Sequence, residues 1–246
     1  MQPLIGITSY FLNTRDKDNK PLERYLSPNV YVSYPTYVHR VERAGGIPID
    51  IPYYLDDASV FALAEKLDGI LFCGGEDVNP QYYGEPVAGT KTVVPERDAL
   101  EFKLLDAFFK LRKPIFGICR GEQVINTFFK GSLIQDIARE NKGYIEHSRS
   151  DNPDSPVHKI AVKTGTRLHS ILGETTVNVN SLHHQAARTP GEGLVVSARS
   201  EDGLVEGLEL PDYPFLLGVQ WHPERLDIPP HFALFEEFIR SSRRSS

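Results

Sequence analysis

Residues 113–123, KPIFGICRGEQ, decide the fold, because they join a strand of the buried type to a G-x-C-x-G turn that opens a helix over Glu122–Phe129. This arrangement is the cysteine counterpart of the nucleophile elbow, a sharp turn that presents a reactive side chain above a sheet edge. Gly117 and Gly121 are expected where side chains would otherwise collide. Cys119 then lies at a helix N-terminus, where unpaired N–H groups favour a thiolate and can stabilise an oxyanion. The stretch predicts an α/β fold with Cys119 as nucleophile; the alternative is a small buried hydrophobic residue.

The first half of the chain alternates short apolar runs with amphipathic ones. This alternation predicts βαβ units around a parallel sheet. Gly45 and Gly46 end the first predicted helix, and Pro52 ends the strand after it, because proline donates no ladder hydrogen bond. The expected elements cover Leu4–Thr8, Val30–Ala44, Ile47–Ile51, Ala58–Leu67, Gly69–Cys73, Arg97–Leu111 and Pro114–Ile118.

The second half changes character, because its apolar strands are separated by turns rich in Gly, Pro and Asp. Such strands pair antiparallel or in a mixed way, so we expect a smaller sheet of this kind in the second half. The polar segment Lys142–Pro156 is too short to indicate a domain linker, and residues 1–246 are predicted to form one domain. The expected strands cover His158–Lys163, Val177–Asn180, Leu194–Ser200, Leu204–Glu209 and Phe215–Gln220.

The composition narrows the class of protein. A net charge of -6 over 246 residues and the lack of a clustered basic surface argue against nucleic-acid binding; the Arg240–Arg244 run is expected to be a solvated tail. No apolar run approaches the roughly 18 residues of a membrane helix, and no secretory leader is visible before Leu4. Cys73 and Cys119 are the only cysteines and give no disulfide framework. We expect a cytoplasmic protein without a membrane partner.

A candidate base and its orienting acid follow the last predicted strand. The strand runs directly into Trp221-His222-Pro223-Glu224. On an extended segment, residues two apart face the same side, so Glu224 can hold the imidazole of His222 while its other nitrogen faces Cys119. Taken alone, a His-Pro-Glu turn is equally a structural turn. Together with the cysteine elbow, it predicts a Cys-His-Glu triad.

A third strand leads into a glycine pair at Leu71–Val78. Taken alone, Gly74 and Gly75 are a turn that caps the strand. Cys73 is expected to pack inside the strand and to be inert.

Two motifs carry a resemblance to a known family. Gly117–Gln123 and Val219–Glu224 resemble, in this order, the two signatures of class I glutamine amidotransferases. Gly74–Glu85 and Asn180–Ala186 are similar to the branch of that family that contains the γ-glutamyl-γ-aminobutyrate hydrolases (peptidase C26). The resemblance covers nearly the whole chain. It implies a three-layer, flavodoxin-like α/β fold with a mostly parallel central sheet flanked by helices.

The resemblance also implies roles for individual residues. Cys119, His222 and Glu224 form the catalytic triad, and the backbone N–H groups of Gly75 and Arg120 form the oxyanion hole. No metal or organic cofactor is implied, His147 and His158 receive no role, and no Cys and His spacing indicates zinc. The pocket for the α-amino and α-carboxylate groups of the substrate is lined by Gln123, Ser181, His183 and His184; the alternative for these histidines is a buried position satisfied by the backbone.

Two short segments qualify the resemblance. Glu96-Arg97-Asp98 fits the same branch, although Glu96 and Asp98 are explained first as acidic residues at a helix start. After the elbow helix the family commonly has a pair of small residues, and Lys130 replaces one of them. The replacement lies outside the triad, so we expect it to affect local packing or pocket shape and to leave the chemistry intact.

These residues predict a hydrolase that cleaves a γ-glutamyl amide through a thioester on Cys119. The amine released is left open between γ-aminobutyrate, a polyamine derivative and an amino acid. One alternative is a glutaminase subunit that delivers ammonia to a separate synthase partner, and another is a non-catalytic binding module. The Tyr10–Ser27 insertion and the Tyr82-Tyr83 loop favour a stand-alone enzyme with a small-molecule substrate. A homodimer is the expected assembly, since symmetric dimers are the commonest.

Overall fold

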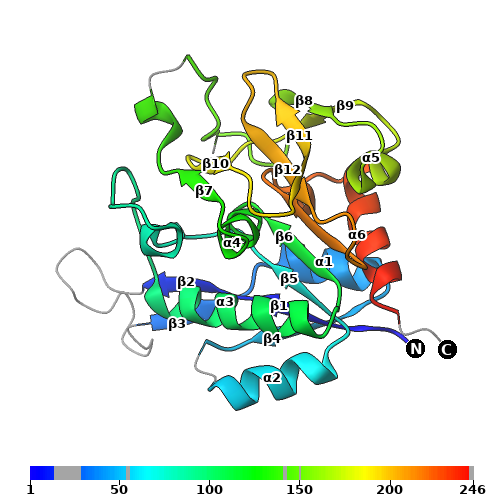
Figure 1. The fold of residues 1–246 in the computed structure, drawn as a ribbon. Coiled ribbons are helices and arrows are strands. Elements are labelled where there is room, and N and C mark those ends of the chain that lie inside the picture. The colour runs from blue at the N-terminus through cyan, green and yellow to red at the C-terminus, as the bar shows by residue number, and fades with distance from the viewer. Residues whose placement is uncertain (14–28, 54–55, 141–142, 150, 244–246) are drawn as a thin grey trace.

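A nine-stranded mixed sheet forms the centre of the fold (Figure 1). This computed structural model describes residues 1–13, 29–53, 56–140, 143–149 and 151–243. The first five strands in the order below pair in parallel, and the remaining pairs are antiparallel. The strands are, in spatial order, β4 (Ile47–Ile51), β1 (Leu4–Thr8), β5 (Gly69–Phe72), β6 (Ile115–Ile118), β13 (Leu216–Val219), β12 (Val205–Glu209), β11 (Val195–Ser200), β8 (His158–Val162) and β9 (Thr176–Val179).

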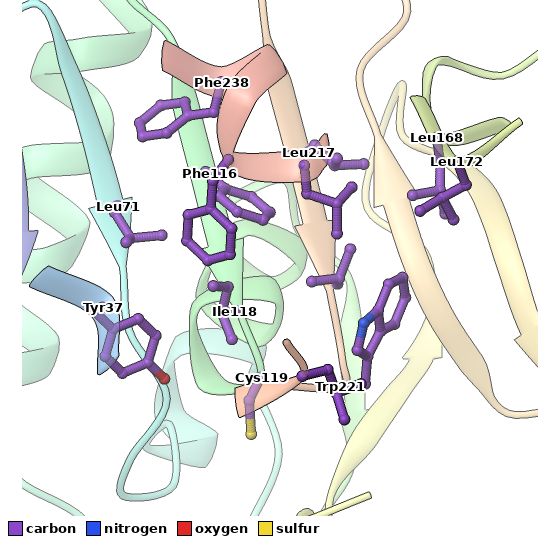
Figure 2. Close-up of a cluster of buried hydrophobic side chains, with 14 of the residues drawn as sticks. Tyr37, Leu71, Phe116, Ile118, Cys119, Leu168, Leu172, Leu217, Trp221 and Phe238 are labelled. Carbon is purple, nitrogen blue, oxygen red and sulfur yellow. The ribbon is translucent and has the colours of Figure 1, made fainter. Parts of the chain in front are cut away.

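Helices cover both faces of this sheet. Alternate residues of the central strands enter two separate apolar clusters: Phe116 and Ile118 pack on one face, and Ile115 packs on the other (Figure 2). Because both faces are buried, these strands are apolar along their whole length. The first cluster includes buried residues of α1 (Pro35–Arg43), α5 (Arg167–Leu172) and α6 (Pro229–Ser241), and the second includes those of α2 (Asp57–Lys66), α3 (Pro95–Lys110) and α4 (Arg120–Phe128). The predicted three-layer fold class is confirmed.

The antiparallel strands of the second half extend the main sheet. β13 pairs in parallel with β6 and antiparallel with β12, so it joins the two kinds of pairing. A small antiparallel sheet of β7 (Ser132–Ile134) and β10 (Ala186–Thr189) also lies in this half. β2 (Tyr10–Asn13) and β3 (Asn29–Val32) pair antiparallel, and short 3-10 helices occupy Pro80–Tyr83, Ile137–Glu140 and Pro223–Arg225. Because β6 and β13 are adjacent and parallel, the residues that follow them emerge at the same edge.

The C-terminal helix corrects one expectation. Residues Arg240 and Ser241 belong to α6, and Ser242 is buried, so this part of the basic run is not a solvated tail. α6 begins at a Pro-Pro pair, which suits the first helical turn, and buries Phe235 and Phe238 against the sheet. The described helices include none with the length and apolarity needed to cross a membrane. Residues 14–27 of the predicted Tyr10–Ser27 insertion lie outside the described residues.

Candidate active site

Cys119 lies in a strained turn between β6 and α4. Its backbone has φ +54° and ψ −105°, a conformation that residues other than glycine rarely adopt. A Cβ added at Gly117 would lie 2.6 Å from the backbone of Gly121, and one added at Gly121 would overlap the carbonyl oxygen of Phe72. The prediction that two glycines are needed here for steric reasons is confirmed. The turn therefore presents the thiol where the strand ends.

His222 and Glu224 lie at the equivalent end of β13. His222 Nδ1 donates a hydrogen bond to Glu224 Oε1 at 2.6 Å, as the spacing of two predicted. His222 and Cys119 line the same cavity, and the charge of Cys119 acts on the imidazole. Asn180 fixes the backbone of His222, because its Oδ1 accepts from His222 N at 2.9 Å and its Nδ2 donates to His222 O at 3.0 Å. The structure thus brings the three predicted triad residues together.

The charges around His222 favour its protonated form. Burial by itself lowers the pKa of an imidazole, but the negative charge of Glu224 and then that of Cys119 raise the pKa of His222 to about 10. An imidazolium beside the cysteine sulfur stabilises a thiolate. The protonated imidazole thus places a positive charge next to Cys119.

A cavity of about 250 Å³ opens onto these groups. Figure 2 shows Cys119 at the end of the apolar residues of β6, with Tyr37 nearby. Tyr10 and Tyr37 bring their hydroxyl groups within 3.1 Å of each other, and the Tyr37 hydroxyl accepts a hydrogen bond from Gly74 N. The lining residues are Tyr10, Tyr34, Thr36, Tyr37, Gly75, Cys119, Leu182, His222, Glu224 and Arg225.

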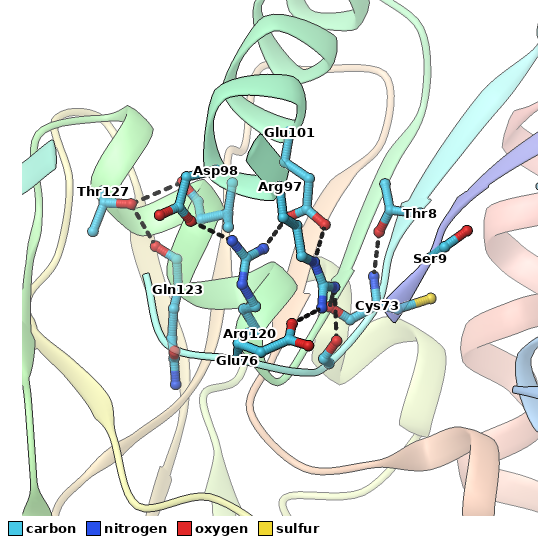
Figure 3. Close-up of polar contacts among 12 residues, drawn as sticks. Thr8, Ser9, Cys73, Glu76, Arg97, Asp98, Glu101, Arg120, Gln123 and Thr127 are labelled. Atoms are coloured by element: carbon cyan, nitrogen blue, oxygen red, sulfur yellow. Dashed lines mark hydrogen bonds and ion pairs between the residues drawn. The ribbon is translucent and has the colours of Figure 1, made fainter. Parts of the chain in front are cut away.

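The glycine turn after β5 is held by a buried arginine (Figure 3). Arg97 Nη2 donates to the carbonyl oxygens of Gly74 at 2.7 Å and Cys73 at 3.2 Å. Its Nε donates to Glu101 Oε1 at 2.8 Å and its Nη1 to Glu76 Oε2 at 2.6 Å. Each guanidinium nitrogen of Arg97 therefore has an acceptor, which a fully buried charge requires.

The same network holds the residue after the nucleophile. The guanidinium of Arg120 donates to Glu101 Oε2 and to Asp98 Oδ1, and both carboxylates are fully buried. Asp98 also accepts a hydrogen bond from Asn79 N at 3.1 Å. Asp98 lies in the first turn of α3, as expected, and it is in addition a partner of Arg120 in the interior. Glu101 joins Arg97 to Arg120.

The sequence reasoning missed this network, although a signal was present. Arg97 and Glu101 are four residues apart and share a helix face with Leu104 and Phe108, which are buried. Charged residues at positions where an amphipathic helix should be apolar indicate a buried ion pair. The resemblance to the family includes Glu96-Arg97-Asp98 but implies no buried ion pairs for these residues.

Four residues are expected to bind the α-amino and α-carboxylate groups of the substrate, and none of them lines the 250 Å³ cavity at Cys119. Gln123 Nε2 donates to Gln220 Oε1 at 3.0 Å inside the protein. Ser181 and His183 point into a buried polar cluster, and Leu182 between them lines the cavity, because side chains alternate along an extended segment. His184 Nε2 contacts Asp77 Oδ1 at 2.8 Å and lines a neighbouring cavity of about 530 Å³. Their role in substrate binding stays a prediction.

Comparisons with known proteins agree with this geometry. The Peptidase C26 family model matches residues 3–224. A protein of Schizosaccharomyces pombe named "Putative glutamine amidotransferase" is 41% identical over 212 residues, which cover 84% of this chain and 81% of the relative. The γ-glutamyl-γ-aminobutyrate hydrolase of Escherichia coli O157:H7 is 40% identical over 198 residues, or 76% of each chain. A Thermoplasma acidophilum crystal structure titled as a "putative gmp synthase subunit a protein" superposes with a TM-score of 0.63 at 16% identity, covering 98% of this chain and 94% of that one, which concerns the fold alone.

Proposed function

The chain belongs to the Peptidase C26 family and is a glutamine amidotransferase-like hydrolase, and we propose that it cleaves γ-glutamyl amides through a thioester on Cys119. The observation that carries this proposal is the position of His222, which lies between Glu224 and Cys119 at the ends of two adjacent parallel strands. A base held by an acid beside a thiol on a strained turn is the arrangement that nucleophilic acyl transfer needs.

The first half-reaction forms the thioester. The thiolate of Cys119 attacks the γ-carbonyl carbon, and the carbonyl oxygen takes up the negative charge. The N–H groups of Gly75 and Arg120 supply hydrogen bonds to this oxygen; no described residue accepts a hydrogen bond from either group. The imidazolium of His222 then gives its proton to the amide nitrogen, the C–N bond breaks and the amine leaves.

The second half-reaction releases glutamate. Neutral His222 takes a proton from a water molecule, whose oxygen forms a bond to the thioester carbon. The C–S bond breaks, which regenerates the thiolate of Cys119 beside protonated His222. Glu224 keeps the imidazole in one orientation throughout, since its Oε1 accepts from Nδ1 at 2.6 Å.

The names of two relatives support the choice of substrate class. The E. coli relative is named as a γ-glutamyl-γ-aminobutyrate hydrolase, so we propose this compound or a related γ-glutamyl amine as the substrate. A second candidate is ammonia release from glutamine for a synthase partner, which the name of the S. pombe relative favours. Both functions use the same triad, and they differ in the leaving group.

A direct assay separates these functions. The purified protein is incubated with γ-glutamyl-γ-aminobutyrate and, separately, with glutamine, and released glutamate is measured. The proposed hydrolase turns over the first compound far faster than glutamine, and Cys119→Ala abolishes this activity while Cys73→Ala, at the other free cysteine, retains it. Turnover of glutamine alone, or only after addition of cell extract, would support the ammonia-delivering subunit. No turnover of either compound would support a binding module.

A further inference from the structure

Four buried side chains from different parts of the chain converge in the interior of the protein. His147 precedes β8, His158 begins β8, His183 follows β9 and Glu206 lies on β12. Glu206 is 0% exposed and the histidines are buried. Its Oε1 lies 3.6 Å from each of three ring nitrogens, which are His147 Nδ1, His158 Nε2 and His183 Nε2. The candidate ligand atoms of His147, His158 and Glu206 all lie within 4.8 Å of one another.

Each histidine is fixed in one orientation by its outer ring nitrogen. His158 Nδ1 contacts the carbonyl oxygen of Lys159 at 3.2 Å, and His183 Nδ1 contacts that of Gln185 at 2.9 Å. Carbonyl oxygens only accept, so these outer nitrogens carry the protons and the inner nitrogens of the neutral rings carry lone pairs.

His147 follows the same pattern with a carboxylate. His147 Nε2 donates to Asp202 Oδ2 at 3.1 Å, so its Nδ1 carries the lone pair that faces inward. Histidines that bind metals almost always donate their other ring N–H to a carboxylate or a backbone carbonyl. All three histidines therefore have the outer hydrogen bonds of metal ligands.

Among the described residues, the inner side of the cluster has a single hydrogen-bond donor, the hydroxyl of Ser181. Within the described part of the chain, the two carboxylate oxygens of Glu206 have no hydrogen-bond partner, and His158 Nε2 has none either. The hydroxyl of Ser181 contacts His147 Nδ1 at 3.0 Å and His183 Nε2 at 3.2 Å, but it has one proton to donate. Most of the lone pairs thus face one another at buried positions, which costs free energy unless a positive charge lies between them.

Protons supply this charge poorly. Burial lowers the pKa values of His147 and His158, and it lowers the pKa of His183 to about 4. Burial also raises the pKa of Glu206 to about 7, so a cation in the cluster would have to compete with one proton.

We propose that His147, His158, His183 and Glu206 bind a divalent transition-metal ion of the zinc type. Around tetrahedral zinc, with bonds of about 2.0–2.2 Å, ligand atoms lie roughly 3.3–3.6 Å apart, which matches the 3.6 Å separations from Glu206 Oε1. Three imidazoles and one carboxylate complete a four-coordinate site without an open position, which is typical of a structural role. The four ligands are scattered in sequence, so no short motif reveals them.

This site is separate from the proposed reaction but is linked to it through the backbone. His147 and His183 line the 530 Å³ cavity, which gives an ion a path inward. Asn180, which holds the backbone of His222, precedes Ser181 in the segment that carries His183. A metal ion would fix this segment against β8 and β12, and it would take no part in the proton transfers.

The test is zinc binding by the full-length protein in a Cys119→Ala background, so that no thiolate competes. The chelator-treated protein is titrated with Zn²⁺ against a chromophoric competitor, and bound metal is measured by mass spectrometry. We expect one zinc ion per chain and a higher Tm with zinc. Glu206→Gln or His158→Gln should weaken binding by about 100-fold or more, and Asp202→Asn by about 10- to 100-fold.

A matched control uses another buried histidine. In His231, Nδ1 accepts from Trp221 Nε1 at 3.3 Å and Nε2 contacts the carbonyl oxygen of Asn178 at 3.1 Å, so both ring nitrogens are already satisfied. His231→Gln should bind zinc as the parent does. Zinc uptake below a tenth of an equivalent by the parent at micromolar concentrations, or equal uptake by the parent and Glu206→Gln, would overturn the proposal.

If a ligand variant fails to fold, the visible spectrum of bound Co²⁺ tests the coordination of the site in the parent protein. Co²⁺ bound by the parent protein should give the intense visible bands of tetrahedral coordination by nitrogen and oxygen. The weak bands of six-coordinate cobalt would show binding at the surface and would equally overturn the proposal.

Discussion

Arg97 Nη2 lies 2.7 Å from the carbonyl oxygen of Gly74 and thereby sets the direction of the next N–H group. In a trans peptide the carbonyl and the N–H of one unit point in opposite directions, so the N–H of Gly75 points away from Arg97. Gly75 lines the cavity that contains Cys119. The guanidinium thus orients one proposed oxyanion donor without contacting the substrate itself.

Gly75→Ala should remove this orientation. Gly75 has φ +140°, and an added Cβ would overlap Arg97 Nη1, so the turn must move. We expect kcat to fall by about 100- to 1,000-fold, the usual cost of losing one oxyanion donor, with a small change in KM. Steady-state assays with the γ-glutamyl substrate check this.

Gly84→Ala is the matched control for Gly75→Ala. Gly84 also has a positive φ, +71°, but an added Cβ would meet no atom within 4 Å. This variant should lose some stability and keep its kcat. Equal kcat values for the two variants would argue against an oxyanion role for Gly75.

The alkaline limit of activity should lie near pH 10. The pKa of His222 is raised from 6.5 to about 10, so the imidazolium that protonates the leaving amine persists through neutral pH. The stabilisation from this charge is fully present below pH 6.5 and is lost as pH rises through about 10. Burial has the largest effect and lowers the pKa of His222, and the negative charge of Glu224 has the largest of the effects that raise it. Glu224→Gln should therefore shift the alkaline limb of the kcat/KM profile to lower pH; an unshifted limb would contradict this assignment.

Alkylation should distinguish the two cysteines. Cys119 is 7% exposed and lines the cavity, whereas Cys73 is 1% exposed and burial raises the pKa of its thiol well above the usual range. Iodoacetamide should label Cys119 first, and Cys73 should react only when the protein unfolds. Peptide mapping by mass spectrometry over time measures both rates. Labelling of Cys73 at the rate of Cys119 would favour the inert module.

Lys130→Gly should stabilise the protein. Lys130 follows the end of α4 with φ +64°, a left-handed conformation that costs residues other than glycine roughly 1 kcal/mol. Its exposed ion pair with Glu192, at 3.0 Å, contributes little in return. We expect the free energy of unfolding in urea to rise by about 1 kcal/mol with activity unchanged. Lys130→Ala loses the same ion pair but keeps a Cβ, so it should gain nothing.

The parts of the molecule that follow from local sterics were predictable. The elbow around Cys119 follows from two glycines at fixed spacing, and His222 and Glu224 meet because extended residues two apart share a face. The central strands are apolar at every position, since both faces are covered. The neighbouring places of β6 and β13 then bring the two motifs together.

The parts that depend on distant pairing were not predictable. In the sequence Asp98 is explained as a helix-start charge and Arg97 receives no role. Their burial depends on partners from other segments, which are Glu76 for Arg97 and Arg120 for Asp98. Ser181 and His183 turn away from the cavity for a similar reason. His183 lies beside Glu206 and the Ser181 hydroxyl contacts His147, and one sequence alone does not place these partners beside them. The oxyanion roles, the homodimer and the cytoplasmic location stay predictions.

The carboxylate of Glu101 accepts from Arg97 with one oxygen and from Arg120 with the other. Its two oxygens are held at a covalently fixed separation, so it acts as a rigid spacer between the glycine turn and the start of α4. Removal of any one of these three side chains would leave a buried charge without its partner and would release one side of the proposed oxyanion hole from the other.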